Sequence, residues 1–287
     1  IPIFYNENGD ILATFRIPTH LEFTEDTLFV MLKEFSKNSN LEISDIKNEN
    51  SNDIKDQLIK NSNNEIFHSV SIEWYKINIK DVEKINSWLW NQYSSEIEEF
   101  WIIKSYKRAL EMIIQNYLWK NKKITKEDIL AINYYEFIEF YESRWEKLED
   151  HNYRNHRVWM NHCFWYTPVD SLLKIDILVD YLLENINKIE NHLIRWIALH
   201  FLMVPIQPFW DWNWRLSRFL MNITFSNWWY KWCTIDKHDY RREFLSSYWL
   251  INEWKYDELL KVYIRFISFI FWYFQFKFNK KDLLDIK

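Results

Sequence analysis

Apolar residues recur at helical spacing in several segments of the chain. Two series illustrate the spacing: Leu193, Ile197 and Phe201, followed by Leu216, Phe219, Leu220 and Ile223. Residues three, four and seven positions apart share one face of an α-helix. Proline and glycine, which interrupt regular structure, number only 5 and 1. The pattern therefore predicts a mostly α-helical protein.

Three segments depart from this pattern. Residues 36–65 are polar and rich in Asn, which predicts a surface loop or a flexible connection behind a short N-terminal piece that could form a hairpin. Residues 151–170, "HNYRNHRVWMNHCFWYTPVD", mix β-forming residues with a proline and predict an irregular hairpin among the helices. Residues 263–276 are strongly apolar but contain Arg265 and are shorter than the roughly 18 apolar residues of a membrane helix. They predict a buried C-terminal helix and no membrane span.

Length, charge and cysteine content limit the function classes. A chain of 287 residues can bury a substantial core, and we expect one core with a helical extension. Lys and Arg total 36 against 41 Asp and Glu, and no basic run interrupts this acidic balance, so nucleic-acid binding is disfavoured. Cys163 and Cys233 cannot form a disulfide framework or a four-cysteine metal site. The opening "IPIFYNENGD" lacks a Met and a leader, so we expect a truncated start and a cytoplasmic protein.

Glycine and tryptophan occur in unusual numbers. An average soluble chain contains about 7% glycine, whereas this chain has 1 glycine and 18 tryptophans. Abundant Asn, Lys and Ile indicate an AT-rich gene, but AT-richness does not explain abundant Trp. We hypothesise that many of these tryptophans stand at glycine positions because UGA codons were read as Trp. The alternative is a Trp-rich core, and composition alone does not separate the two.

The stretch "IQPFWDWNWRLSRFLMN", residues 206–222, has the form of a phosphate-binding turn that leads into a helix. Asn213 is placed to cap a helix that begins at residue 214 or 215. Arg215 and Arg218 lie three positions apart and so project along one side of that helix. Backbone N–H groups of such a turn bind phosphate oxygens, and glycine permits the positive φ angles that the turn needs. Bulky tryptophan at 210, 212 or 214 would be strained there.

With glycine at positions 210, 212 and 214, part of this stretch becomes "QPFGDGNGRLSR". It then resembles the H-P-F-x-D/E-G-N-G-R-x-x-R motif of Fic-domain proteins. The matching residues are Pro208, Phe209, Asp211, Asn213, Arg215 and Arg218. The flanks agree, since "RVWMNHCFWYTPV" resembles the hairpin upstream of the motif and "KKITKEDIL" a helix start common in the family. The resemblance spans roughly residues 69–265 and implies a mostly helical Fic-type core with a small β-hairpin flap.

The resemblance also implies an activity, which is transfer of AMP from ATP–Mg to a hydroxyl of a protein target or of the protein itself, with release of pyrophosphate. By position, Asp211 would hold the magnesium ion. The implied phosphate-binding residues are Trp212, Asn213, Trp214, Arg215 and Arg218. The flap, about residues 157–167, would bind the target as an added strand. Without the resemblance, the two arginines would be interpreted as a solvated helix face paired with nearby acids.

Gln207 departs from the family pattern, because it stands at the position of the catalytic His. That His accepts the proton of the attacking hydroxyl, and a carboxamide has no comparable basicity. General-base catalysis is typically worth about 10²–10⁴-fold, so we expect a poor transferase or none. The sequence allows a degenerate Fic protein that still binds nucleotide, or a change at this one position by error or by design.

A second motif lies upstream, in "SVSIEWYKINIKDV", residues 69–82. With glycine at 74 it resembles the inhibitory helix S/T-x-x-x-E-G/N of many Fic proteins, and Ser69 and Glu73 carry the match. The resemblance implies that Glu73 pairs with Arg218 and blocks productive placement of the γ-phosphate. In some relatives the same Glu helps water remove AMP from the target, so de-adenylylation is a further reading. An exposed helical Glu is the structural alternative.

These motifs divide the chain into an unassigned N-terminal segment, residues 1–60, a helical region with the inhibitory motif, residues 61–100, and a Fic-type core, residues 101–287. His151, His156 and His162 have no regular helical spacing for a metal ion, so we expect a surface or flap role for them rather than zinc binding. We expect His200 to pack on the helix before the motif. Two other functions stay open, a silent nucleotide-binding regulator on the Fic fold and an unrelated Trp-rich protein that stacks single-stranded bases. The sequence leaves target and oligomeric state open, a homo-oligomer included.

Overall fold

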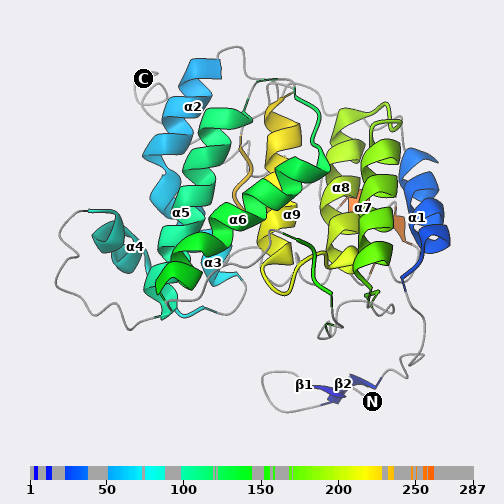
Figure 1. Ribbon diagram of the computed structural model, residues 1–287, viewed down its shortest axis with the longest axis horizontal. Coiled ribbons are helices and arrows are strands. Elements are labelled where there is room, and N and C mark those ends of the chain that lie inside the picture. The colour runs from blue at the N-terminus through cyan, green and yellow to red at the C-terminus, as the bar shows by residue number, and fades with distance from the viewer. Residues whose placement is uncertain are drawn as a thin grey trace, which may run out of the picture.

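Helices make up most of the part of the chain that the structure describes (Figure 1). The structure is a computed structural model and describes residues 3–5, 11–14, 23–37, 51–72, 75–87, 98–118, 120, 122–143, 152–155, 158, 168–169, 171–227, 232–235, 247, 250, 255–256 and 258–261. The helices are α1 (Glu25–Lys37), α2 (Ser51–Lys60), α3 (Ser62–Ser71), α4 (Ile79–Asn86), α5 (Glu98–Asn116), α6 (Lys126–Ser143), α7 (Leu172–Ile186), α8 (His192–Ile206) and α9 (Asn213–Ser226). The predicted predominance of helix is confirmed.

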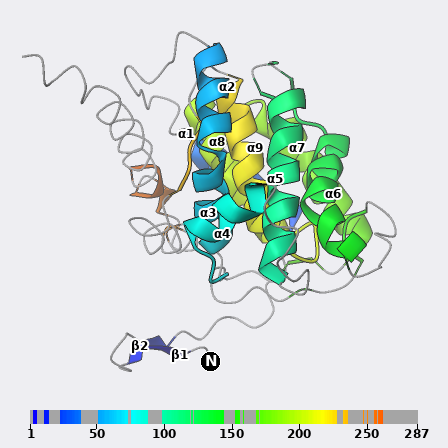
Figure 2. The same ribbon diagram turned by 90° about the vertical axis from the view of Figure 1, so that its left-hand side faces the viewer.

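Helix α9 lies in the middle of the helical body. On one side it packs against α8, which in turn packs against α7 and α1, and on the other side it contacts α6, the partner of α5 (Figure 1). Helix α3 packs against α5, and the turned view shows α3 and α4 close to one end of α5 (Figure 2). Segments that are far apart in the sequence therefore meet around α9.

Helix α8 is apolar on nearly every side, and this makes it a core helix rather than an amphipathic one. Asn191 caps it, because its Oδ1 accepts hydrogen bonds from the backbone N–H groups of Leu193 and Ile194. The indole of Trp196 stacks on the ring of Phe225 from α9, with 4.5 Å between the ring centroids. All seven apolar residues of the two predicted series are buried: Leu193, Ile197, Phe201, Leu216, Phe219, Leu220 and Ile223.

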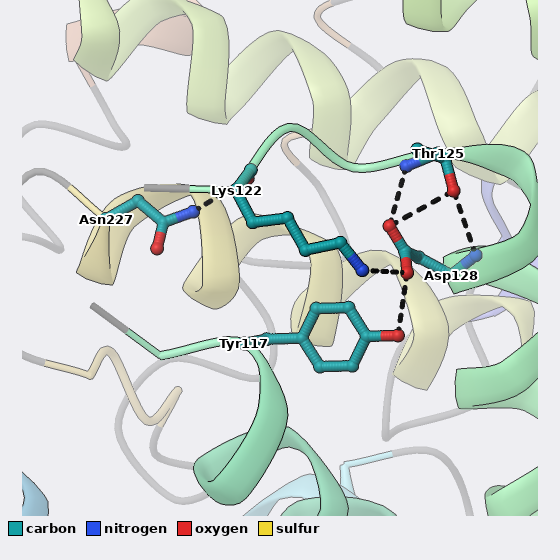
Figure 3. A network of polar contacts seen from close by, with 5 residues as sticks. All are labelled: Tyr117, Lys122, Thr125, Asp128 and Asn227. Atoms are coloured by element: carbon teal, nitrogen blue, oxygen red, sulfur yellow. Dashed lines mark hydrogen bonds and ion pairs between the residues drawn. The ribbon is translucent and has the colours of Figure 1, made fainter. Parts of the chain in front are cut away.

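A polar network fixes the loop between α5 and α6 to the end of α9 (Figure 3). Lys122 Nζ lies 2.6 Å from Asp128 Oδ1, and the Tyr117 hydroxyl donates to the same oxygen over 2.9 Å. Thr125 and Asp128 form a capping box at the start of α6, which agrees with the helix start expected in "KKITKEDIL". Burial favours the neutral carboxyl, but these donors outweigh it and lower the pKa of Asp128. Asn227 donates to the carbonyl oxygen of Lys122, which ties the network to α9.

The polar stretch at residues 36–65 is not a loop throughout, so that expectation is wrong over residues 51–65. Helix α2 and the start of α3 lie there. The region has few apolar residues; Leu58 of α2 and Ile66 of α3 are buried, whereas Ile59 is 51% exposed. Lys55, Asp56 and Lys60 are exposed, whereas Glu65 is buried, so the polar composition of the region did not reveal its helices.

The structure describes the strands of the expected N-terminal hairpin, little of the expected flap and none of the expected C-terminal helix. The N-terminal hairpin is confirmed, since strands β1 (Ile3–Tyr5) and β2 (Ile11–Thr14) pair antiparallel. Most of the expected flap at 157–167 and all of the C-terminal helix at 263–276 lie outside the described residues. None of the helices described here is long and apolar enough to span a membrane.

Candidate functional site

The turn between α8 and α9 is bounded by two residues with left-handed backbone. Gln207 ends α8 with φ 47°, and Trp212 precedes α9 with φ 62°. Within the described part of the chain, these are the two non-glycine residues with positive φ. Both lie inside the stretch that the sequence singled out, and of the three positions at which positive φ was expected only 212 has it.

Asn213 holds this turn together from within. Its Oδ1 accepts a hydrogen bond from the N–H of Phe209, and its Nδ2 donates to the carbonyl oxygen of Phe209, both over 2.9 Å. Nδ2 also donates to Oε1 of Gln207 over 2.9 Å. The expectation that Asn213 caps the helix is wrong, because Asn213 is the first helical residue and its side chain bonds back to the turn. The capping position belongs to Trp212, whose carbonyl oxygen accepts from the N–H groups of residues 215 and 216.

Trp212 combines an unfavourable backbone with a buried side chain. A left-handed conformation costs a residue other than glycine about 1–2 kcal/mol. The indole is only 3% exposed and stacks on Phe137, with 4.1 Å between ring centroids and 9° between ring planes. The strain expected at 210 and 214 is absent, since neither residue has positive φ and Trp214 lies within α9. Of the three motif positions, the backbone therefore favours glycine at 212 alone.

The two motif arginines are buried, so the alternative of a solvated helix face is wrong. Arg215 has 0% exposure, and its guanidinium carbon lies 4.4 Å from the centre of the Trp212 ring and 5.2 Å from that of Tyr75. Arg218 donates from Nε to the hydroxyl of Ser69 and from Nη2 to the carbonyl oxygen of Ser69, both over 3.0 Å. The structure thus brings Ser69 to Arg218 across 149 positions of sequence. Glu73 lies outside the described residues.

A buried carboxylate that the sequence analysis missed lies one helical turn before Ser69. Glu65 accepts hydrogen bonds from the hydroxyls of Tyr106, over 2.7 Å, and Thr234. Burial raises the pKa of Glu65, although these two hydroxyls and the charge of Arg218 favour the ionised form. Glu65 and Ser69 lie four residues apart, which places both on one face of α3. This spacing could have identified Glu65 from the sequence.

Gln207 is buried and its side-chain amide is hydrogen bonded at both ends. Nε2 donates to the carbonyl oxygen of Val204 over 2.9 Å, and Oε1 accepts from Asn213. The backbone on the other side is held by Arg154, which the sequence analysis also missed. Its guanidinium Nε donates to the carbonyl oxygen of Gln207 over 2.6 Å. Position 207 is therefore oriented by contacts on both its side chain and its backbone.

Asp211 lies at the exposed rim of the turn, and its Oδ1 accepts a hydrogen bond from the N–H of Trp212 over 2.7 Å. In the described part of the chain, no group of three or more His, Cys, Asp or Glu residues could hold a metal ion. A magnesium ion here would need further oxygen ligands from phosphates or water.

His200 is a buried residue of α8. Its burial, together with the charge of Arg218, lowers the pKa of its imidazole to about 3, so the imidazole stays neutral.

Comparisons with known proteins identify the fold. No protein-family model matches the chain, and no curated protein gives a significant match. Fic-1 from C. elegans superimposes with a TM-score of 0.59 at 18% identity, over 91% of this chain and 73% of that one. A Fic domain containing signaling protein from Bacteroides thetaiotaomicron gives a TM-score of 0.60 at 15% identity, over 85% of this chain and 91% of that one. The chain therefore has the fold of Fic-domain proteins.

Proposed function

We propose that the turn at residues 207–213 and the start of α9 form a binding site for the phosphates of ATP, and that the chemistry of this site is transfer of AMP to a protein hydroxyl. In that reaction the hydroxyl oxygen bonds to the α-phosphorus, pyrophosphate leaves, and the hydroxyl proton must pass to a base. The observation that carries the proposal is the arrangement around Asn213. It orders the turn at the start of α9, with Arg215 and Arg218 close behind.

The helix start and the arginines supply two complementary attractions for phosphate. Unpaired N–H groups at the N-terminus of a helix, together with its dipole, favour an anion. Guanidinium groups add charge-assisted hydrogen bonds, which are about twice as strong as neutral ones. Asp211, at the rim, would supply a carboxylate oxygen to magnesium, and the ion would offset the charge of the phosphates.

With tryptophan at 212 we expect the site to bind phosphates weakly or not at all. The indole covers the guanidinium of Arg215, which has no exposed surface. Glycine at 212 would remove the indole from the guanidinium, which would still contact the ring of Tyr75, and would relieve the left-handed strain. The proposal therefore includes the hypothesis that residue 212 is glycine in the living protein. Sequencing the gene tests it: UGA at codon 212 supports the hypothesis, and UGG overturns it.

Autoinhibition belongs to the same proposal. Arg218 is hydrogen bonded to Ser69 of α3, so helix α3 already engages the guanidinium that would bind the terminal phosphate of ATP. Glu73 follows Ser69 by four positions and would add a carboxylate to this contact. We propose that α3 and the residues after it lower the activity of the site until they move.

The alternative is a nucleotide-binding regulator without catalysis on the same fold, and one observation favours it. The amide of Gln207 is satisfied by Val204 and Asn213, and it has no basic atom to accept a proton. Calorimetry with ATP–Mg and detection of labelled AMP on proteins separate the readings, using full-length protein with Trp212→Gly. Binding with transfer supports adenylylation, binding without transfer supports the regulator, and no binding overturns both.

A further inference from the structure

Residues 152–155 lie against the turn between α8 and α9, just before the expected flap. The backbone N–H of Arg154 donates to the carbonyl oxygen of Pro208 over 2.9 Å. Its guanidinium donates from Nε to the carbonyl oxygen of Gln207 over 2.6 Å and from Nη2 to that of Ile206 over 3.4 Å. One residue thus contacts three consecutive carbonyl groups.

Packing adds to these hydrogen bonds. The ring of Tyr153 lies 5.5 Å from the ring of Phe209, centroid to centroid, and both side chains are buried. Arg154 is itself 5% exposed. A buried guanidinium is costly unless it is paired, and here it binds carbonyls at the end of α8, which lack helical partners and carry the negative end of the helix dipole.

These contacts determine how residue 207 is presented. Its N–H donates to the carbonyl oxygen of Val204, and its carbonyl oxygen is bound by Arg154, so the peptide groups on both sides are fixed. Residue 207 adopts left-handed backbone, and its side chain then points to Asn213. Because these backbone contacts do not involve the side chain, they would also hold the backbone of another residue at 207.

We propose that Arg154 is a positioning residue for the side chain at position 207, and that it links residues 152–155 to this position, where the base of the reaction would stand. This inference rests on the proposed function, because position 207 matters for catalysis only if AMP transfer takes place there. Two properties of Arg154 act separately. Its planar fork orients the backbone of residue 207, and its positive charge disfavours protonation of a base placed at 207.

The test uses full-length protein with Trp212→Gly and Gln207→His, so that a titratable base stands at 207. Arg154→Gln removes the charge but keeps a donor, whereas Arg154→Lys keeps the charge but loses the fork. Arg108→Gln is the control, since Arg108 lies on α5 and pairs with Glu139 at 2.7 Å. Circular dichroism verifies folding, and NMR follows the extra imidazole signal that Gln207→His introduces.

In Arg154→Gln we expect the pKa of the new imidazole to rise by at least about half a unit, with the acid limb of the pH–rate profile moving equally. In Arg154→Lys we expect the imidazole pKa to change little, while kcat falls about tenfold or more and KM for ATP stays within about twofold. Arg108→Gln should alter neither quantity.

Two results overturn the inference: an imidazole pKa that is the same with Arg and Gln at 154, or an unchanged kcat in Arg154→Lys. If one of the two variants fails to fold, the other still gives its own decisive measurement. Absence of AMP transfer in every protein would defeat the proposed function instead. In that event the NMR titration of Arg154→Gln alone decides whether Arg154 acts on residue 207.

Discussion

The indole of Trp212 stacks on the ring of Phe137 from α6, at 4.1 Å between centroids, while the backbone of Trp212 is left-handed. A favourable ring contact and an unfavourable conformation thus occur in the same residue. The ring pair contributes about 0.5–1.5 kcal/mol beyond its burial, and the conformation costs about 1–2 kcal/mol. The two terms nearly cancel, which leaves burial of the indole as the main stabilising effect of tryptophan at this position.

Trp212→Gly should create or tighten binding of ATP–Mg by at least about tenfold, because it removes the indole that lies against the guanidinium of Arg215. Loss of the buried indole should at the same time lower the free energy of unfolding by about 1–4 kcal/mol, after the relieved strain is subtracted. Calorimetry and urea unfolding measure the two effects. Trp210→Gly is the matched control, since Trp210 is 62% exposed and has no positive φ. Equal ATP affinity in both variants would refute the phosphate-binding turn.

Gln207→His, made together with Trp212→Gly, should raise AMP transfer by about 10²–10⁴-fold, since the imidazole accepts the proton that the carboxamide cannot. Labelled ATP and autoradiography of the protein measure the transfer. Gln207→Asn is the control, because it also changes the side chain at 207 but supplies no base. Strong labelling with Gln207 retained would show that the base lies elsewhere.

Ser69→Ala should weaken the hold of α3 on Arg218, because the hydroxyl that accepts from Nε is lost. In protein with Trp212→Gly and Gln207→His we expect ATP–Mg to bind about two- to tenfold more tightly. Glu73→Gly in the same background should raise AMP transfer above the level of protein with Trp212→Gly and Gln207→His alone. Ser71→Ala, on the same helix but not bonded to Arg218, is the control for helix stability. Autoinhibition would be contradicted if Ser69→Ala did not tighten ATP–Mg binding and Glu73→Gly did not raise AMP transfer.

His200 should make the protein less stable as the pH falls. Its pKa is lowered to about 3 in the folded state, against an ordinary value of 6.5, so between these values the unfolded chain binds more protons than the folded one. The contribution is complete above about pH 6.5 and is lost as the pH falls toward 3. Urea unfolding at several pH values should show a smaller decline below pH 6.5 for His200→Gln. Parallel curves would contradict the buried neutral imidazole.

Glu65 should act in the opposite direction. Its pKa is raised above 4.5 by burial, so the folded state holds its proton to higher pH than the unfolded state does. Its contribution is complete below about pH 4.5 and is lost as the pH rises through the folded-state pKa. Glu65→Gln, which keeps an acceptor for Tyr106, should flatten this loss in unfolding measured from pH 4.5 upward. A steeper loss in the variant would show that the carboxylate is better stabilised than its burial implies.

Helix content was readable from the sequence because it depends on local spacing. Leu193, Ile197 and Phe201 repeat at helical intervals, and a helix with such a stripe must bury it. The polar segment at 51–65 was misread because few apolar residues are enough to anchor a helix once a neighbour covers them. Residues 207–218 were singled out from the sequence by their resemblance to the Fic motif, and the structure confirms that a turn there leads into a helix.

The sequence by itself determined the helical class, the turn at 207–213 and the residues that belong to it, because each of these rests on neighbours in the chain. Only the tertiary structure decided which distant groups meet them: Ser69 on Arg218, Arg154 on the carbonyl of Gln207, and Phe137 under Trp212. It also decided that 212 needs a left-handed backbone while 210 and 214 do not. Such contacts depend on how the helices pack. They pair buried charges and aromatic rings that lie far apart in the sequence, so a local sequence pattern does not predict them.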